Sequence, residues 1–253
     1  MRGMYLLLVM VLLTSACGKK GALIYPDLLV PAAPANVSVR QVGSSMKLGF
    51  KLPDKDKAGQ PLKDLSGVKI LRRETTEGQD IGCNSCANDF RVFKAIYVDH
   101  LDASIQRFGS TFMMLDSDVR AGSEYAYRVL AFTKGNVSGE ASKPVQAALV
   151  QAVQPPVLQS LSEPTEVKLE FVGQPPLEGV LAGYNLYRTV KGDSLPFLAL
   201  NKEPLANNSF IDAGLERGVI YVYAVRMVVR LPNGELVESV LSNEVEAGLS
   251  DAE

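Results

Sequence analysis

The sequence has 253 residues, with 26 Lys and Arg against 28 Asp and Glu, so its formal net charge is -2. A nucleic-acid-binding domain normally carries a clustered excess of basic residues, so this balance argues against nucleic acid as a partner. The chain contains one His and three Cys, so it has few candidate ligands for a metal ion or a haem.

Residues 1–16 have the pattern of a secretory signal peptide. Arg2 precedes an apolar run from Met4 to Leu13, and the small residues Ser15 and Ala16 follow it. A membrane-spanning helix needs about 20 apolar residues, roughly twice the length of this run. We therefore expect residues 1–16 to be removed during export rather than to cross the bilayer.

Cys17 changes the kind of signal peptide that this segment resembles. Thr14, Ser15 and Ala16 before it resemble the lipobox of bacterial lipoproteins, with Thr14 standing where the family usually has Leu. The resemblance implies that the thiol of Cys17 carries lipid, that cleavage occurs before it, and that the chain is anchored to a membrane. Gly18, where Asp would favour the inner membrane, implies the outer membrane of a bacterial cell envelope, with the chain facing the periplasm. The alternative is an ordinary cleaved signal peptide with an incidental cysteine.

After a tether, the chain repeats itself. Residues 17–34 are rich in Pro and Ala without periodicity, which predicts a semi-extended, lipid-anchored tether. Further on, "LDSDVRAGSEYAYRV" from Leu115 aligns with "IDAGLERGVIYVYAV" from Ile211, and Ser142 aligns with Ser242. Two copies of about 100 residues each have the usual size of a domain. The repeat therefore predicts a first domain over 35–150, with an inserted loop, and a second over 154–249.

Each copy shows the period-two alternation of a strand that buries one face. Apolar residues occupy every second position of "MKLGFK" (46–51) and of "EVKLEF" (166–171). The side chains between them, Lys47 and Lys168 included, are then expected on the solvent face. Asn233-Gly234 predicts a hairpin, because both residues tolerate positive φ. Short strands of this kind, without a helical stripe, predict an all-β fold of two tandem sandwiches.

The stretches "VRAGSEYAYRVLAF" and "LERGVIYVYAVRMV" resemble the E-to-G half of fibronectin type III modules. The resemblance implies two tandem immunoglobulin-like β-sandwiches that act without catalysis, as modules for protein binding or scaffolding. It also places Tyr125 and Tyr221 at the tyrosine-corner position. There the phenol hydroxyl bonds the backbone a few residues upstream.

The family often carries a tryptophan in its second strand, and this chain has none. Leu48 and Leu169 are among the residues that can fill that space. Tyr127 and Tyr223 lie two positions after the corner tyrosines. Rows of tyrosine can stack on sugars, but alternate positions of one repeated strand favour core packing.

The motif "IGCNSC" places Cys83 and Cys86 three positions apart. Such a pair can close a disulfide, act as a redox couple or supply two of four metal ligands. A c-type haem requires His at position 87, which is Ala, and zinc requires further ligands at motif spacing. Lipidation of Cys17 would leave an even cysteine count in an oxidising compartment, so we predict a structural disulfide and expect no metal or other cofactor.

The remaining polar candidates favour structural interpretations. His100 follows Asp99, but no Gly-x-Ser-x-Gly motif accompanies it, so a solvated loop residue is predicted rather than a general base. Asp99 with Asp102, and Asp116 with Asp118, resemble paired carboxylates or a calcium loop. The ligand pattern of an EF-hand is missing, which predicts turns or solvated edges and no catalytic residue.

These observations predict a non-enzymatic, membrane-anchored envelope lipoprotein that presents two modules to an envelope protein. Two alternatives stay open: a periplasmic thiol-disulfide redox protein using Cys83 and Cys86, and a carbohydrate- or cell-wall-binding module. The first copy has 43 residues between Arg72 and Asp116, whereas the second has 23 between the aligned positions. Because inserted loops often carry function, we expect residues 74–88 to form the main partner-contacting surface.

Overall fold

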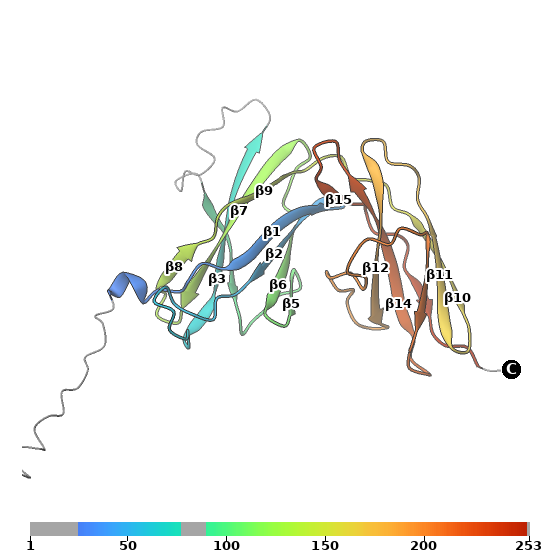
Figure 1. Cartoon of the computed structure of the whole chain (residues 1–253), viewed down its shortest axis with the longest axis horizontal. Helices are drawn as coiled ribbons and strands as arrows, with labels where there is room; N and C mark the ends of the chain where they lie inside the picture. Colours follow the sequence, from blue (N-terminus) through green and yellow to red (C-terminus); the bar gives the residue numbers. More distant parts are fainter. Residues whose placement is uncertain (1–24, 77–89, 252–253) are drawn as a thin grey trace, which may run out of the picture.

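The computed structural model describes residues 25–76 and 90–251, and the three cysteines lie outside these ranges. Apart from one 3₁₀ turn, η1 (Pro26–Leu28), the elements of the described residues are β-strands. They form two sandwiches joined in tandem (Figure 1). The all-β fold predicted from the alternating pattern is therefore confirmed. Among the described residues, no helix has the length and apolar character needed to cross a membrane.

The first module comprises strands β1 to β9, arranged in two facing sheets. One sheet has the order β1 (Ala35–Val42), β2 (Ser45–Lys51), β6 (Thr111–Asp116) and β5 (Ile105–Phe108). The other has the order β4 (Arg91–Tyr97), β3 (Leu65–Thr76) and β7 (Ser123–Thr133), and β7 also pairs with β8 (Ser138–Ala141) and β9 (Val145–Ala148). The two additional strands β4 and β5 fall within the segment that is longer in the first copy.

The second module comprises strands β10 to β16 and repeats this plan. One sheet has the order β10 (Val157–Ser162), β11 (Glu166–Val172) and β13 (Ser209–Ala213). In the other, β12 (Val180–Val190) pairs with β14 (Tyr221–Arg230), which also pairs with β15 (Leu236–Glu238) and β16 (Val245–Ala247). Residues 150–156 form the linker between the modules.

Each module has its own hydrophobic core between its two sheets. The apolar positions of 46–51 lie in the first core, and those of 166–171 lie in the second. Leu48 and Leu169, proposed to take the space of a family tryptophan, both have no exposed surface. The period-two prediction therefore identified the buried face of β2 and β11 correctly.

The repeat also places equivalent polar residues in equivalent roles. In each module the last strand is interrupted, between β8 and β9 and between β15 and β16. In these gaps the hydroxyl of Ser142 accepts the N–H of Val129 at 3.0 Å, and that of Ser242 accepts the N–H of Val225 at 3.0 Å. Each serine oxygen accepts a hydrogen bond from the neighbouring strand at a point where that strand's regular pairing is interrupted, so a buried donor stays satisfied.

The predicted hairpin at Asn233-Gly234 is present, with a different turn. Leu231 N–H donates to the carbonyl of Glu235 at 2.8 Å, and β14 pairs with β15 across the loop. Gly234 has a φ of 88°, whereas Asn233 is not among the residues of positive φ. Only the glycine therefore takes the left-handed conformation, and Asn233 instead accepts the N–H of Glu235 through its side chain.

The described end of the expected tether is bonded to the first module. Lys57 N–H donates to the carbonyl of Val30 at 3.0 Å, and Ala32 N–H donates to the carbonyl of Lys55 at 3.1 Å. Pro31 is buried and accepts the N–H of Glu140 at 3.1 Å. These bonds fix the direction in which the chain leaves the module toward its amino terminus.

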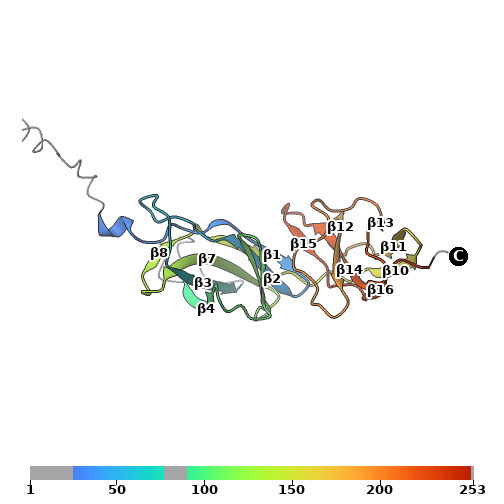
Figure 2. The same ribbon diagram turned by 90° about the horizontal axis from the view of Figure 1, so that it is seen from below.

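A shared sheet joins the two modules. β1 pairs in parallel with β15 at Val42 and Glu238, and Gly43 N–H donates to the carbonyl of Glu238 at 2.9 Å. The sheet β5-β6-β2-β1 thereby continues into β15-β14-β12 and, with β16, contains eight strands. Figures 1 and 2 both show β1 running up to β15 at the junction.

Candidate functional site at the junction of the two modules

Each module contains a buried Arg–Asp–Tyr cluster at aligned positions. In the first, the guanidinium of Arg72 lies 2.8 Å from the carboxylate of Asp116, which also accepts the hydroxyl of Tyr127 at 2.7 Å. In the second, Arg188 lies 2.8 Å from Asp212, which accepts the hydroxyl of Tyr223 at 2.8 Å.

This pair of clusters corrects the prediction that Asp116 sits in a turn or at a solvated edge. Asp116 is 1% exposed, and a carboxylate at that depth requires a cationic partner. Burial raises the pKa of Tyr127, and the charge of Asp116 raises it further. The phenol therefore stays protonated and donates. The same cluster is present in both modules, which argues against a specialised site. We therefore interpret the clusters as interactions that stabilise the fold of each sandwich.

The corner tyrosines bond the backbone five residues upstream. Arg120 N–H donates to the hydroxyl of Tyr125 at 2.8 Å, and Glu216 N–H donates to the hydroxyl of Tyr221 at 3.3 Å. In both cases the phenol oxygen is the acceptor. The hydroxyl of Tyr125 also donates to the carboxylate of Glu74 at 2.9 Å.

The loop around His100 shows no catalytic geometry. His100 is exposed in a tight turn, where its N–H donates to the carbonyl of Tyr97 at 3.1 Å, and Asp99 is exposed beside it. Asp102 pairs with Lys94 at 2.8 Å, and hydrogen bonds from Lys94 and from Ser104 lower the pKa of Asp102 to about 2. Among the described residues, no group of three or more His, Cys, Asp or Glu could hold a metal ion.

A network of buried charges lies where the modules meet. Glu238 is 1% exposed and lies 3.0 Å from the ammonium of Lys47, which belongs to the other module. Tyr187 donates its hydroxyl to the second carboxylate oxygen of Glu238. Arg40 approaches the same carboxylate to 3.8 Å, and Arg226 donates to the carbonyl of Ser239 at 2.7 Å. The junction is thus closed by an ion pair as well as by a β-bridge.

Burial and charge oppose each other in this network. Burial lowers the pKa of Lys47, and the attraction of Glu238 offsets this only in part. Burial by itself would raise the pKa of Glu238, but the charge of Lys47 and the hydrogen bond from Tyr187 outweigh it, so the pKa of Glu238 is lowered. The carboxylate of Glu238 is therefore ionised at neutral pH.

Two glutamines complete the contact between the modules. Gln106 on β5 donates to the carbonyl of Leu195 at 3.0 Å and accepts the N–H of Phe197 at 2.6 Å. Gln41, which is 2% exposed, bonds both backbone groups of Val150 at 2.9 Å. Each side-chain amide donates one hydrogen bond to the facing backbone and accepts one from it, as the backbone of a paired β-strand residue does. The second module is therefore held through its β12–β13 connection and through the linker.

Lys47 corrects the prediction of a solvent-facing polar side of β2. It is 7% exposed, because the second module covers that side of the strand. Lys168 occupies the aligned position of β11, and its side chain is 42% exposed. The sequence carried one indirect signal of this difference: the longer connection of the first copy supplies β5 and Gln106 to the contact.

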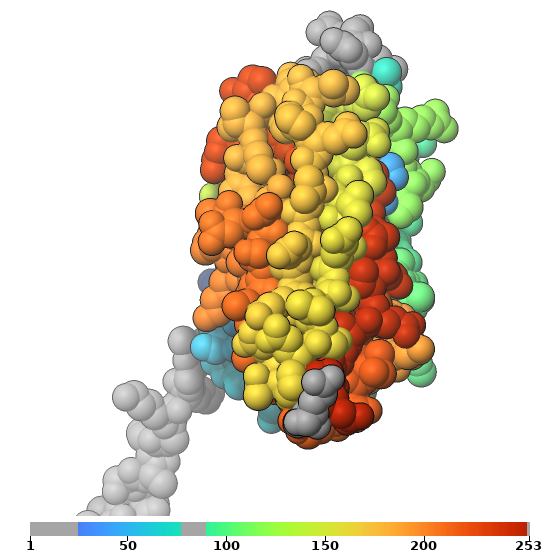
Figure 3. Space-filling model, turned by 90° about the vertical axis from the view of Figure 1, so that its right-hand side faces the viewer, coloured from blue at the N-terminus to red at the C-terminus, as the bar shows by residue number. Residues whose placement is uncertain are grey.

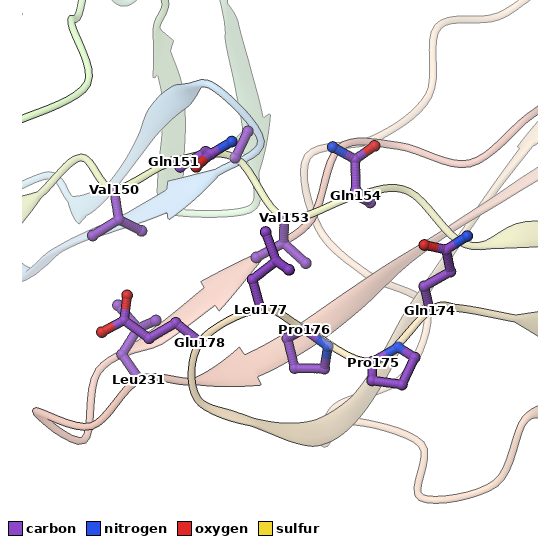
Figure 4. Close-up of a pocket in the computed structure, with 11 residues that line it drawn as sticks. Val150, Gln151, Val153, Gln154, Gln174, Pro175, Pro176, Leu177, Glu178 and Leu231 are labelled. Carbon is purple, nitrogen blue, oxygen red and sulfur yellow. The ribbon is translucent and has the colours of Figure 1, made fainter.

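The described residues form three hollows at or near the junction. Lys47 and Phe197 line two of them, which have volumes of about 250 and 180 Å³. The third, of about 300 Å³, lies between the linker and the β11–β12 loop. Figure 4 shows Leu177 on that loop and Val153 on the linker among the residues that line this hollow, and Leu177 is 95% exposed.

The far end of the second module presents a different surface. Figure 3 views this end, where β10 and β11 lie at the front. Four apolar side chains of the three-stranded sheet are exposed there: Val157, Leu161, Val172 and Ile211. Leu161 and Ile211 flank Lys168 in register across the sheet.

Three predicted features lie wholly or largely outside the described residues. They are the cysteine pair predicted to form a disulfide, the lipidation residue Cys17 and most of the predicted contact surface 74–88.

No family model matches this chain, and no curated protein matches it. The chain is similar to the crystal structure of the FN1–FN3 domains of chicken CNTN1, with 14% sequence identity and a TM-score of 0.32. The similarity covers 86% of this chain and 66% of that one, slightly under two thirds of its length. The class of the protein rests on its own strands and their pairing: it consists of two tandem immunoglobulin-like β-sandwiches.

Proposed function

We propose that this protein is a non-enzymatic lipoprotein of the bacterial cell envelope that presents two rigidly joined modules to an envelope protein. The observation that carries the proposal is the junction. A sheet shared between modules, with a buried ion pair between Lys47 and Glu238, holds two sandwiches in one orientation. A fixed spacing between two modules is useful for scaffolding, whereas the described residues bring together no nucleophile, base and oxyanion site.

The anchor in this proposal is lipid on Cys17, attached to the outer membrane and leaving both modules in the periplasm. Changing Cys17→Ala should release the protein from membranes or leave it as an uncleaved precursor. Fractionation with detergent partitioning reads out both results. A cleaved Cys17→Ala protein that still partitions with the membrane would contradict the lipid anchor.

The partner is sought by photo-crosslinking in living cells with the full-length chain. A crosslinking side chain is placed in the second module at Leu177, beside the linker, and in a separate variant in the first module at the exposed Val137, just before β8. The proposal expects a discrete crosslinked envelope protein from at least one of the two positions. The same experiment is repeated after residues 74–88 are shortened. Loss of the crosslink would assign the contact to these residues, and a crosslink that persists would place the contact elsewhere on the modules. Crosslinks to no protein from either module would refute the scaffold.

The cysteine pair separates this proposal from a redox function. Alkylation of the purified chain before and after reduction should show Cys83 and Cys86 joined, by the change in mass. Rapid turnover of a disulfide substrate, abolished by Cys83→Ser, would replace the scaffold with a thiol-disulfide activity.

A further inference from the structure

The charges at the junction do not balance. Arg40, Lys47 and Arg226 surround a single buried carboxylate, that of Glu238. Both carboxylate oxygens already accept a hydrogen bond, one from Lys47 and the other from Tyr187. The cations are not saturated. Glu238 and the carbonyl of Phe197 accept two of the three donors of Lys47, and Arg226 has five donors and one bond among the described residues, to Ser239.

A recess of about 250 Å³ lies against the two unsaturated cations. The polar part of its lining consists of Lys47, Arg226 and the phenol of Tyr187. The rest of its lining is mainly apolar: Val42, Leu115, Leu195, Pro196, Phe197 and Leu241. Strands and connections of both modules contribute to it, so the recess exists only while the modules are joined.

Of the described residues that line the recess, one is acidic. Glu244 also lines the recess, is exposed, and forms no ion pair among the described residues. Glu244 therefore leaves the donors of Lys47 and Arg226 available, and its negative charge lowers the positive electrostatic potential in the recess.

We propose that this recess binds a carboxylate that a partner polypeptide presents beside an apolar side chain. The donors are Lys47 and Arg226, and the apolar wall receives the neighbouring side chain. A volume of about 250 Å³ is below the usual range for small-molecule sites, which suits one or two side chains rather than a cofactor. Carboxylate is favoured because the network already holds Glu238 with the same ammonium donor, at 3.0 Å.

This inference rests on the proposed function only for the class of partner, and its test needs no identified partner. The purified full-length chain, with labelled Leu and Val methyl groups, is titrated with N-acetyl-Leu-Glu-amide. Saturable shifts are expected at Val42, Leu195 and Leu241. The uncharged N-acetyl-Leu-Gln-amide should bind at least about tenfold more weakly, because it lacks the charge-assisted hydrogen bonds. N-acetyl-leucine, with a free carboxylate, shows whether a chain terminus serves as well as a side chain.

Variants test the position of the carboxylate without disturbing the buried ion pair. Glu244→Gln should tighten binding of the glutamate peptide about threefold, because it removes a repelling charge at the rim. Glu203→Gln is the matched control: it makes the same change beside the neighbouring hollow of about 180 Å³ and should leave the affinity unchanged within about 1.5-fold. Arg226→Gln should reduce the difference between the glutamate and glutamine peptides, because it removes one of the two cationic donors and leaves Lys47 in place.

Three results would overturn the proposal: equal binding of the two peptides, no saturable shift up to about 10 mM, or equal effects of Glu244→Gln and Glu203→Gln. Peptide binding in the recess combined with no crosslinked protein in cells would uphold the site and refute the scaffold. The reverse pattern would uphold the scaffold and place its contact elsewhere.

Discussion

Removing the negative charge of Glu238 should weaken the junction severely. The change Glu238→Gln keeps the size of the side chain and an acceptor for Tyr187, but leaves the ammonium of Lys47 buried without its counter-charge. Lys47 is 7% exposed and Glu238 is 1% exposed, so solvent screens neither group. Removing one partner of a buried ion pair lowers the free energy of unfolding by about 3 to 5 kcal/mol. Because the Gln side chain can still accept the hydroxyl of Tyr187, we expect Glu238→Gln to lie near the lower end of this range.

A double-mutant cycle isolates the pair. Lys47→Met alone should also destabilise the chain, because it leaves the carboxylate buried beside Tyr187. The double variant should regain about 2 kcal/mol relative to the sum of the single changes, since it buries no uncompensated charge. Urea unfolding of the full chain, followed by far-ultraviolet circular dichroism, measures all four free energies of unfolding.

The aligned lysine of the second module is the control. Lys168 pairs with Glu163 at 2.7 Å, but this ion pair is on the surface. Lys168→Met should therefore change the free energy of unfolding little. Additive effects of Lys47→Met and Glu238→Gln, or an equal effect of Lys168→Met, would refute the argument that the second module buries the charge.

The same pair predicts a dependence on pH. The pKa of Glu238 in the folded chain is below its ordinary value of 4.5, so its contribution to stability is complete above that value and is lost as the pH falls through the folded pKa. Glu238→Gln should remove this part of the acid dependence. An unchanged stability profile below pH 4.5 in the variant would show that the carboxylate is not stabilised by the fold.

Two further predictions concern single hydrogen-bonded groups. Tyr125→Phe and Tyr221→Phe should each lower the free energy of unfolding by about 0.5 to 1.5 kcal/mol, with the larger loss for Tyr125, which also bonds Glu74; calorimetry of each variant measures this, and unchanged transitions would contradict it. Asp102 should titrate with a pKa of about 2 by carbon-13 NMR, and Lys94→Met should move that pKa up toward the ordinary value of 3.8; a pKa that does not respond would show that the pair at 2.8 Å is not populated in solution.

Local patterns predicted the modules well. The alternation in 46–51 and 166–171 identified the core faces of β2 and β11, because side chains of a strand alternate whatever lies beyond it. The aligned serines and Arg–Asp–Tyr positions were visible as a repeat. Their chemistry was not, because an aspartate becomes a buried ion-pair partner only when a guanidinium from another strand lies within reach, as Arg72 does for Asp116.

The sandwich fold of each copy could be predicted from the sequence, since period-two burial and turn residues are local properties of the chain. The place where the modules touch could not be predicted in this way, and it emerges only from the folded structure. Lys47 and Lys168 occupy aligned positions in strands with the same alternation, yet one is 7% exposed and the other has a side chain 42% exposed. The physical reason is that burial depends on what packs against a face, and the second module, 191 residues away in sequence at Glu238, packs against only one of them.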